Sequence, residues 1–169
     1  AYISRLIRPL NERGFTIFTM KHRGAGEGNG LARGTYHSGR SDDVSAGLQF
    51  TVGLYPTLPV FAVGDSRSGN MLMTLLGQRA DFIPQPLRGA VAVCAPIDLA
   101  LCSRTLSLPR NKPYDSVYVR STMQLLKARQ QQFADFPKLE LPKITSLYLF
   151  DDHVIAPLNG FNSALDYYD

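Results

Sequence analysis

The sequence predicts an α/β fold with a parallel three-strand core, followed by a helical cap or lid region. Three short apolar runs, at residues 15–20, 59–63 and 87–94, have the length and composition of buried strands. Helical patterns separate them, and strands that alternate with helices form a parallel sheet through right-handed crossovers. Beyond Asp98 only helical patterns follow. We therefore expect a core over residues 1–98 and a helical cap over residues 99–169.

The first strand is expected between a helix and a long glycine-rich loop. Arg13 and Gly14 end the helix, and the loop covers residues 21–40. Ser41 then caps a second helix, which Pro56 ends. The apolar residues at helical spacing are Tyr2, Ile3, Leu6, Ile7 and Leu10 in the first helix, and Val44, Leu48 and Val52 in the second.

The helical region begins where Asp98 caps a helix that runs to Leu106. Residues 109–113 are expected to be a linker, followed by one long helix over residues 117–133. Residues 143–150 and 163–168 are expected to be helical as well. The long helix carries one largely apolar side, formed by Met123, Leu126, Gln130 and Phe133.

Composition excludes several classes of protein. Hydrophobic residues make up 44% of the 169 and charged residues 19%, as in a folded globular protein. The net charge of +4 comes from scattered lysines and arginines, so no nucleic-acid partner is expected. Cys94 and Cys102 lack metal or redox spacing and are expected to be buried free thiols. No run is apolar enough to span a bilayer, and no cofactor or metal is expected.

The second strand leads into the most informative motif of the chain. Gly64-Asp65-Ser66-Arg67-Ser68 joins this strand to a helix that begins near Ser68. A serine at such a sharp turn, in the pattern G-x-S-x-G, is the nucleophile elbow of serine hydrolases. Here the last glycine is replaced by Ser68, with Gly69 one place later. The alternative interpretation is that Asp65 or Ser66 only caps the helix.

Four stretches together resemble the α/β-hydrolase superfamily, and within it the AB hydrolase 4 family of esterases and lipases. They are Arg23-Gly24, Tyr36-His37-Ser38-Gly39 with Asp42-Asp43, the run from Gly64 to Leu72, and Phe150-Asp151-Asp152 with Ala156-Pro157-Leu158 and Gly160-Phe161. The resemblance implies a partial α/β-hydrolase fold and an ester hydrolase that acts through an acyl-enzyme. The substrate would be a small-molecule or lipid ester, and no cofactor is implied.

The resemblance assigns Ser66 as the nucleophile and the backbone N–H of Arg67 as an oxyanion-hole donor. It implies that the acid and the histidine base lie beyond Asp169, and that one strand and an oxyanion loop precede Ala1. The chain then looks like an internal portion carrying the nucleophile, inactive by itself. Asn159 stands where the family often has histidine. The alternative function is a non-catalytic hydrolase-like remnant or a binding module.

An in-chain triad of Ser66, Asp98 and His153 has the right chain order and remains an alternative. His22 and His37 precede the serine and are expected to be structural. Adjacent acids before His153 point in different directions on a helix, so a metal site there is not expected. Location stays open between the cytoplasm and a membrane surface, with which the complete protein could associate.

Two structural expectations follow from the resemblance. The strand implied before Ala1 would lie between the strands at 15–20 and 59–63, so we expect a gap in the sheet or a shift of residues 15–20 to fill it. The long helix is expected to place its apolar side over Ser66 and to form an acyl pocket there.

Overall fold

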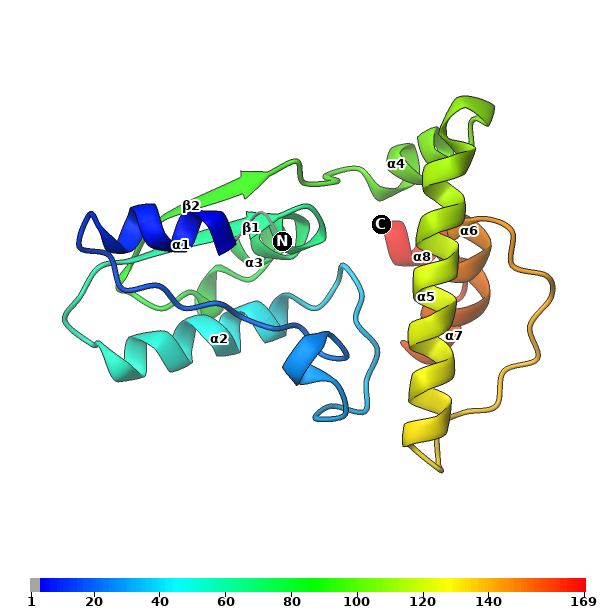
Figure 1. Ribbon diagram of the computed structural model, residues 1–169, viewed down its shortest axis with the longest axis horizontal. Helices are drawn as coiled ribbons and strands as arrows, with labels where there is room; N and C mark the ends of the chain where they lie inside the picture. The colour runs from blue at the N-terminus through cyan, green and yellow to red at the C-terminus, as the bar shows by residue number, and fades with distance from the viewer. Residues whose placement is uncertain (1–3) are drawn as a thin grey trace.

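A computed structural model describes residues 4–169 and confirms a mixed α/β fold (Figure 1). Its sheet has two parallel strands, β1 (Val60–Asp65) and β2 (Leu87–Val93), with Ala62 opposite Ala90. Helix α3 (Arg67–Gln78) and the short 3₁₀ turn η2 (Ala80–Phe82) form the crossover between them. This unit agrees with the strand–turn–helix–strand order that the sequence predicts.

The prediction of a third strand at residues 15–20 is wrong. These residues are extended but pair with no strand in the described part of the chain, so the core has two strands instead of three. Aromatic side chains still pack this segment against the fold. The ring centroids of Phe15 and Phe61 lie 6.4 Å apart, and those of Phe18 and Tyr55 lie 5.8 Å apart, both in edge-on contacts. A strand exists only as part of a hydrogen-bonded ladder, and this apolar run has no adjacent partner. The expected shift of residues 15–20 into pairing with a strand is therefore not observed among the described residues.

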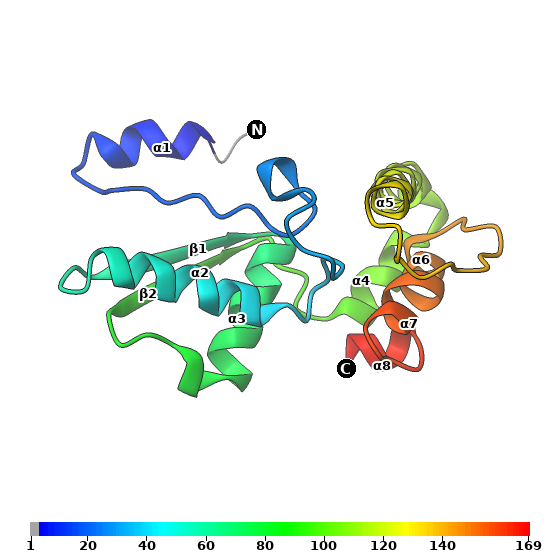
Figure 2. The same cartoon turned by 90° about the horizontal axis from the view of Figure 1, so that it is seen from below.

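The two faces of the sheet differ. Figure 2 shows α3 on one side of the strands and α1 (Ser4–Asn11) on the other. Helix α2 (Ser41–Leu54) packs against α3, and its most buried residues are Ser41, Ser45 and Leu48, whereas Val44 and Val52 are half-buried. No residue of α1 is buried, and the predicted helix residues Tyr2 and Ile3 lie outside the described residues. The sheet face toward α1 therefore stays largely exposed.

That face carries four apolar side chains in register. They come from alternate positions of both strands and are 40–61% exposed: Phe61, Val63, Val91 and Val93. Parallel strands are usually covered on both faces. In residues 4–169, only the face under α3 is covered in this way.

Helices follow from Leu99 to the end of the chain, with no strand among them, as predicted. They are α4 (Leu99–Leu106), η3 (Pro109–Asn111), α5 (Lys112–Gln132), α6 (Leu147–Phe150), the π-helical turn η4 (Asp151–Ile155), α7 (Ala156–Leu158) and α8 (Ala164–Tyr168). The expected linker at 109–113 is instead helical, because prolines are compatible with the first turn of a helix. The expected helix at 143–150 begins only at Leu147, where Ser146 caps it by accepting a hydrogen bond from the Leu149 N–H.

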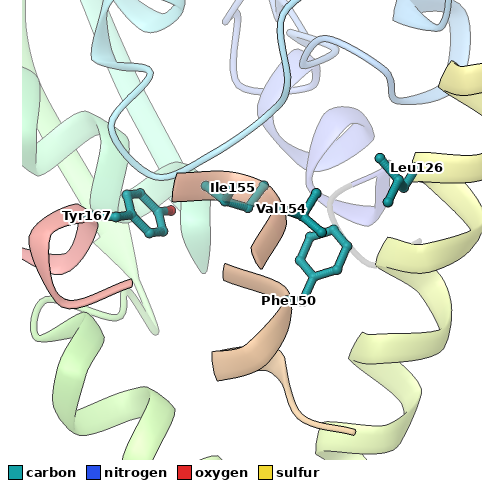
Figure 3. Packing of buried hydrophobic residues seen from close by; sticks show 5 residues of the cluster. All are labelled: Leu126, Phe150, Val154, Ile155 and Tyr167. Atoms are coloured by element: carbon teal, nitrogen blue, oxygen red, sulfur yellow. The ribbon is translucent and has the colours of Figure 1, made fainter. Parts of the chain in front are cut away.

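A compact apolar cluster holds these helices together (Figure 3). Leu126 of α5 packs beside Phe150 and Val154, and Ile155 continues the cluster toward Tyr167 of α8. Of the predicted apolar side of the long helix, Leu126 is buried in this cluster and Met123 packs against it, whereas Phe133 is half-buried and Gln130 is exposed. No helix among residues 4–169 combines the length and the apolar character that crossing a membrane requires.

Candidate active site

Ser66 occupies the turn between β1 and α3 in a strained backbone conformation. Its φ is +52° and its ψ is −123°, a region that residues with a side chain rarely adopt. Two backbone bonds fix the turn: the Ser66 N–H donates to the Val93 carbonyl at 2.8 Å, and its own carbonyl accepts from Asn70 at 3.2 Å. Ser66 is exposed, and its side chain forms no capping hydrogen bond to α3 among residues 4–169. Simple capping therefore does not explain this serine.

The strand and the helix cross at two glycines. A Cβ on Gly64 would come within 2.8 Å of Gly69, and a Cβ on Gly69 would lie 2.9 Å from both the Ala95 Cβ and the Gly64 carbonyl oxygen. Both distances are shorter than real Cβ contacts. The small residue that the crossing requires is thus Gly69, so Ser68 in place of the usual glycine does not disturb the packing.

Ser68 instead contacts His22 from the glycine-rich loop. Its Oγ lies 2.7 Å from the His22 Nε2, and the His22 ring stacks on Tyr36 at 4.7 Å between centroids. Nδ1 of His22 is buried and has no hydrogen-bond partner within the described part of the chain. Burial lowers the pKa of His22. The positive charge of Arg67 lowers this pKa further, whereas the negative charge of Asp43 raises it. The sequence contains no signal for this contact, because the two residues are 46 positions apart.

Arg67 points its side chain at the same aromatic ring. Its guanidinium carbon lies 4.9 Å from the centroid of Tyr36, and the residue is half-buried. Arg23, next to His22, binds both carboxylate oxygens of Asp43. This bond holds the pKa of Asp43 below its usual range. Loop and elbow helix are therefore joined by polar contacts around Tyr36.

The helices from α5 onward fasten the same loop from the opposite side. Nη2 of Arg129 donates to the carbonyl oxygens of Ala32, Arg33 and Gly34. Asn159, found where the resembling family often has histidine, exchanges hydrogen bonds with Thr35 and donates to the Ile155 carbonyl at 2.7 Å. Both contacts hold the loop in place beside the elbow. Helix α5 packs mainly on α4, α6 and η3, so its position over Ser66 stays a prediction.

Within the described residues, the structure shows no hydrogen bond between Ser66 and the two alternative triad residues, Asp98 and His153. Asp98 is exposed and caps α4 by accepting from the Leu101 N–H at 2.7 Å, the structural role that the sequence also allowed. His153 lies in η4 with no hydrogen bond to Ser66 or Asp98 among the described residues. His37, which is expected to be structural, is buried edge-on against Phe161 and Tyr167, and burial lowers its pKa to about 4.

The acids before His153 bond to protein groups. Asp151 accepts from the Tyr168 hydroxyl at 2.8 Å, and Asp152 accepts from the Ala164 N–H at 2.7 Å.

Cys94 and Cys102 are free thiols, as expected, but neither is fully buried, and Cys94 is exposed. Two surface cavities lie away from Ser66. The one of about 260 Å³ is lined by residues of α2 and α3 and by Phe82, and the one of about 120 Å³ by Arg33, Phe133 and Leu158 among others.

Sequence comparison finds relatives over nearly the whole chain. A protein of Escherichia coli named as an esterase, YheT, is 33% identical over 99% of this chain and 49% of its own length. Phospholipase ABHD3 of Homo sapiens is 25% identical over 99% of this chain and 41% of its own length. Medium-chain fatty acid ethyl ester synthase/esterase 2 of Saccharomyces cerevisiae is 25% identical over 98% of this chain and 42% of its own.

No family model and no solved structure matches the chain. The chain spans about half the length of the curated relatives it matches. Together with the mixed α/β fold, the relatives support a relation of this chain to the α/β-hydrolase superfamily.

Proposed function

We propose that this chain carries the nucleophile of a serine ester hydrolase. The single observation that carries the proposal is Ser66 itself: it is exposed, lies between β1 and α3 at a positive φ, and its side chain forms no capping hydrogen bond to α3 within the described residues. That position presents a hydroxyl at the end of a parallel strand, where serine hydrolases place their nucleophile. The names of the relatives, an esterase, a phospholipase and an ester synthase/esterase, support an ester as the substrate.

In the proposed reaction, the Ser66 Oγ attacks the ester carbonyl and passes its proton to a general base. The backbone N–H of Arg67, at the start of α3, donates to the oxyanion of the tetrahedral intermediate. The alcohol leaves with the proton, and water then hydrolyses the acyl-enzyme by the same steps. We expect the acid and the base from the remainder of a longer protein. The substrate is a small-molecule or lipid ester, and the helices after Asp98 act as a cap.

Covalent labelling of the full-length gene product with a fluorophosphonate tests the proposal. We expect Ser66→Ala to abolish labelling, because the probe reacts with activated serines. Ser116→Ala, at an exposed serine of α5, is the matched control and should label like the wild type. Ser68→Ala tests the neighbouring serine that contacts His22. Equal labelling of wild type and Ser66→Ala would contradict the assignment.

A non-catalytic hydrolase-like protein is the second candidate, favoured by one observation. None of the three histidines hydrogen-bonds to Ser66 within the described residues: His22 pairs with Ser68, His37 is enclosed by aromatic rings, and His153 lies in η4. A serine without a base is a weak nucleophile at neutral pH. Absence of labelling and of ester hydrolysis in the full-length, folded gene product would favour this candidate.

A further inference from the structure

Arg67 has a charge that the described part of the chain does not neutralise. Its guanidinium forms no ion pair and donates no hydrogen bond there, although the residue is half-buried. Its guanidinium carbon lies 4.9 Å from the centroid of the Tyr36 ring. A cation–π contact uses the charge of the guanidinium but not its N–H donors. The donors of Arg67 therefore remain available to an acceptor.

The surrounding groups leave this positive charge in excess. Asp43, in the first turn of α2, is already bound by Nε and Nη2 of Arg23. His22 cannot compensate this charge, because an imidazole is either neutral or positively charged. Asp151, whose pKa Arg67 lowers, lies beyond ion-pair distance and is bonded to Tyr168. An anion beside Arg67 would meet a donor that no carboxylate of the described residues occupies.

The position of Arg67 next to Ser66 indicates that the bound anion would be part of the substrate. The residue directly follows Ser66, and its backbone N–H is the proposed oxyanion donor. Tyr36 holds the side chain, and Tyr36 is itself held by stacking on His22. A group bound by the guanidinium would thus lie a few bonds from the carbonyl that Ser66 attacks. An arginine fork suits the planar oxygens of carboxylate and phosphate.

We propose that the Arg67 guanidinium is a binding subsite for an anionic group, carboxylate or phosphate, carried by the ester substrate close to its reacting carbonyl. This inference rests on the proposed function and adds the charge of the substrate to it. Arg67 would act in binding and selectivity through its side chain, separately from its backbone N–H.

Two esters that differ by one charge test the proposal in the full-length gene product. They are mono-p-nitrophenyl glutarate, which has a free carboxylate, and its neutral methyl ester. We expect Arg67→Gln to lower the ratio of kcat/KM for the anionic ester over the neutral ester by about tenfold or more, mainly through KM. Arg67→Lys, which keeps the charge but loses the fork, should give an intermediate ratio.

The control variant is Arg120→Gln, which removes the same charge from an exposed position on α5. It should leave the ratio unchanged. An unchanged ratio in Arg67→Gln overturns the proposal. An equal loss of kcat/KM with both esters also overturns it. That result would mean that the charge of Arg67 acts on the oxyanion or on folding, and not on an anionic group of the substrate.

A binding measurement separates this subsite from the proposed function. If the wild type hydrolyses neither ester, the hydrolase proposal fails, and the subsite is judged by titrating acetate and inorganic phosphate into ¹⁵N-labelled protein. Saturable movement of an arginine Nε–H signal that is missing in Arg67→Gln supports the subsite. The anion that moves it at lower concentration tells carboxylate from phosphate. No movement with either anion overturns the proposal.

Discussion

Asp151 is a buried carboxyl with one strong partner, the hydroxyl of Tyr168 at 2.8 Å. Burial raises its pKa to about 6 from a reference of 3.8, against the lowering effects of Tyr168 and Arg67. Between these two values the folded chain binds a proton that the unfolded chain has released. Its contribution to stability is therefore fully present below about pH 4 and is lost as the pH rises through about 6.

We predict that Asp151→Asn removes this loss, because asparagine accepts the Tyr168 hydrogen bond without a charge. Relative to the wild type, the variant should gain on the order of 1–3 kcal/mol in unfolding free energy between pH 4 and pH 7.5. Urea unfolding at the two pH values measures the difference. His37, whose lowered pKa makes stability rise between about pH 4 and 6.5, is present in both proteins and cancels. A pH-independent difference would contradict the prediction.

At the scale of elements, the crossing of α3 over β1 depends on Gly69. We predict that Gly69→Ala destabilises the chain by about 1–3 kcal/mol, because the new Cβ would lie 2.9 Å from Ala95 and from the Gly64 carbonyl oxygen. Gly77 provides the control in the same helix, since a Cβ there meets nothing within 4 Å. Gly77→Ala should stabilise by about 0.5–1 kcal/mol. Thermal unfolding of both variants checks the pair, and equal effects would refute the close crossing.

Most elements could be predicted from local patterns, whereas the wrong third strand and the missed contacts of the loop have a common cause. The order strand, Ser66 turn, helix and strand from residue 60 to 93 follows from hydrophobic runs and small residues close together in the sequence. Residues 15–20 have an equally good strand pattern, but whether they form a strand depends on a partner distant in the chain. The contact of Ser68 with His22 spans 46 positions and the contacts of Arg129 span 95–97, so neither leaves a local trace.

In the whole molecule, Arg129 links the loop before α2 to the helices after Asp98. We predict that Arg129→Met loosens this connection, because three carbonyl oxygens lose a charged donor. Amide hydrogen exchange across residues 30–36 should become faster, and stability should fall by about 1–3 kcal/mol. Arg120→Met, at an exposed site of the same helix, is the control. Unchanged exchange in Arg129→Met would show that the loop is held by other contacts.

The exposed sheet face predicts how residues 1–169 behave alone in solution. Phe61, Val63, Val91 and Val93 form a contiguous apolar surface, which favours dye binding and self-association. We predict that Val63→Thr with Val91→Thr lowers the fluorescence of bound anilinonaphthalene sulfonate and the self-association seen by sedimentation. Val117→Thr, at a 58% exposed position of α5, should change neither. Dye binding that persists in the double variant would place the responsible surface elsewhere.

The glycine at position 69 also affects how such turns are recognised in other sequences. A signature that fixes the second glycine two places after the serine passes over this chain, which has Ser68 there. The physical requirement is a missing side chain where the helix touches the strand, and in this chain that point falls one residue later. A search pattern that accepts either spacing would retrieve divergent members that the stricter form discards.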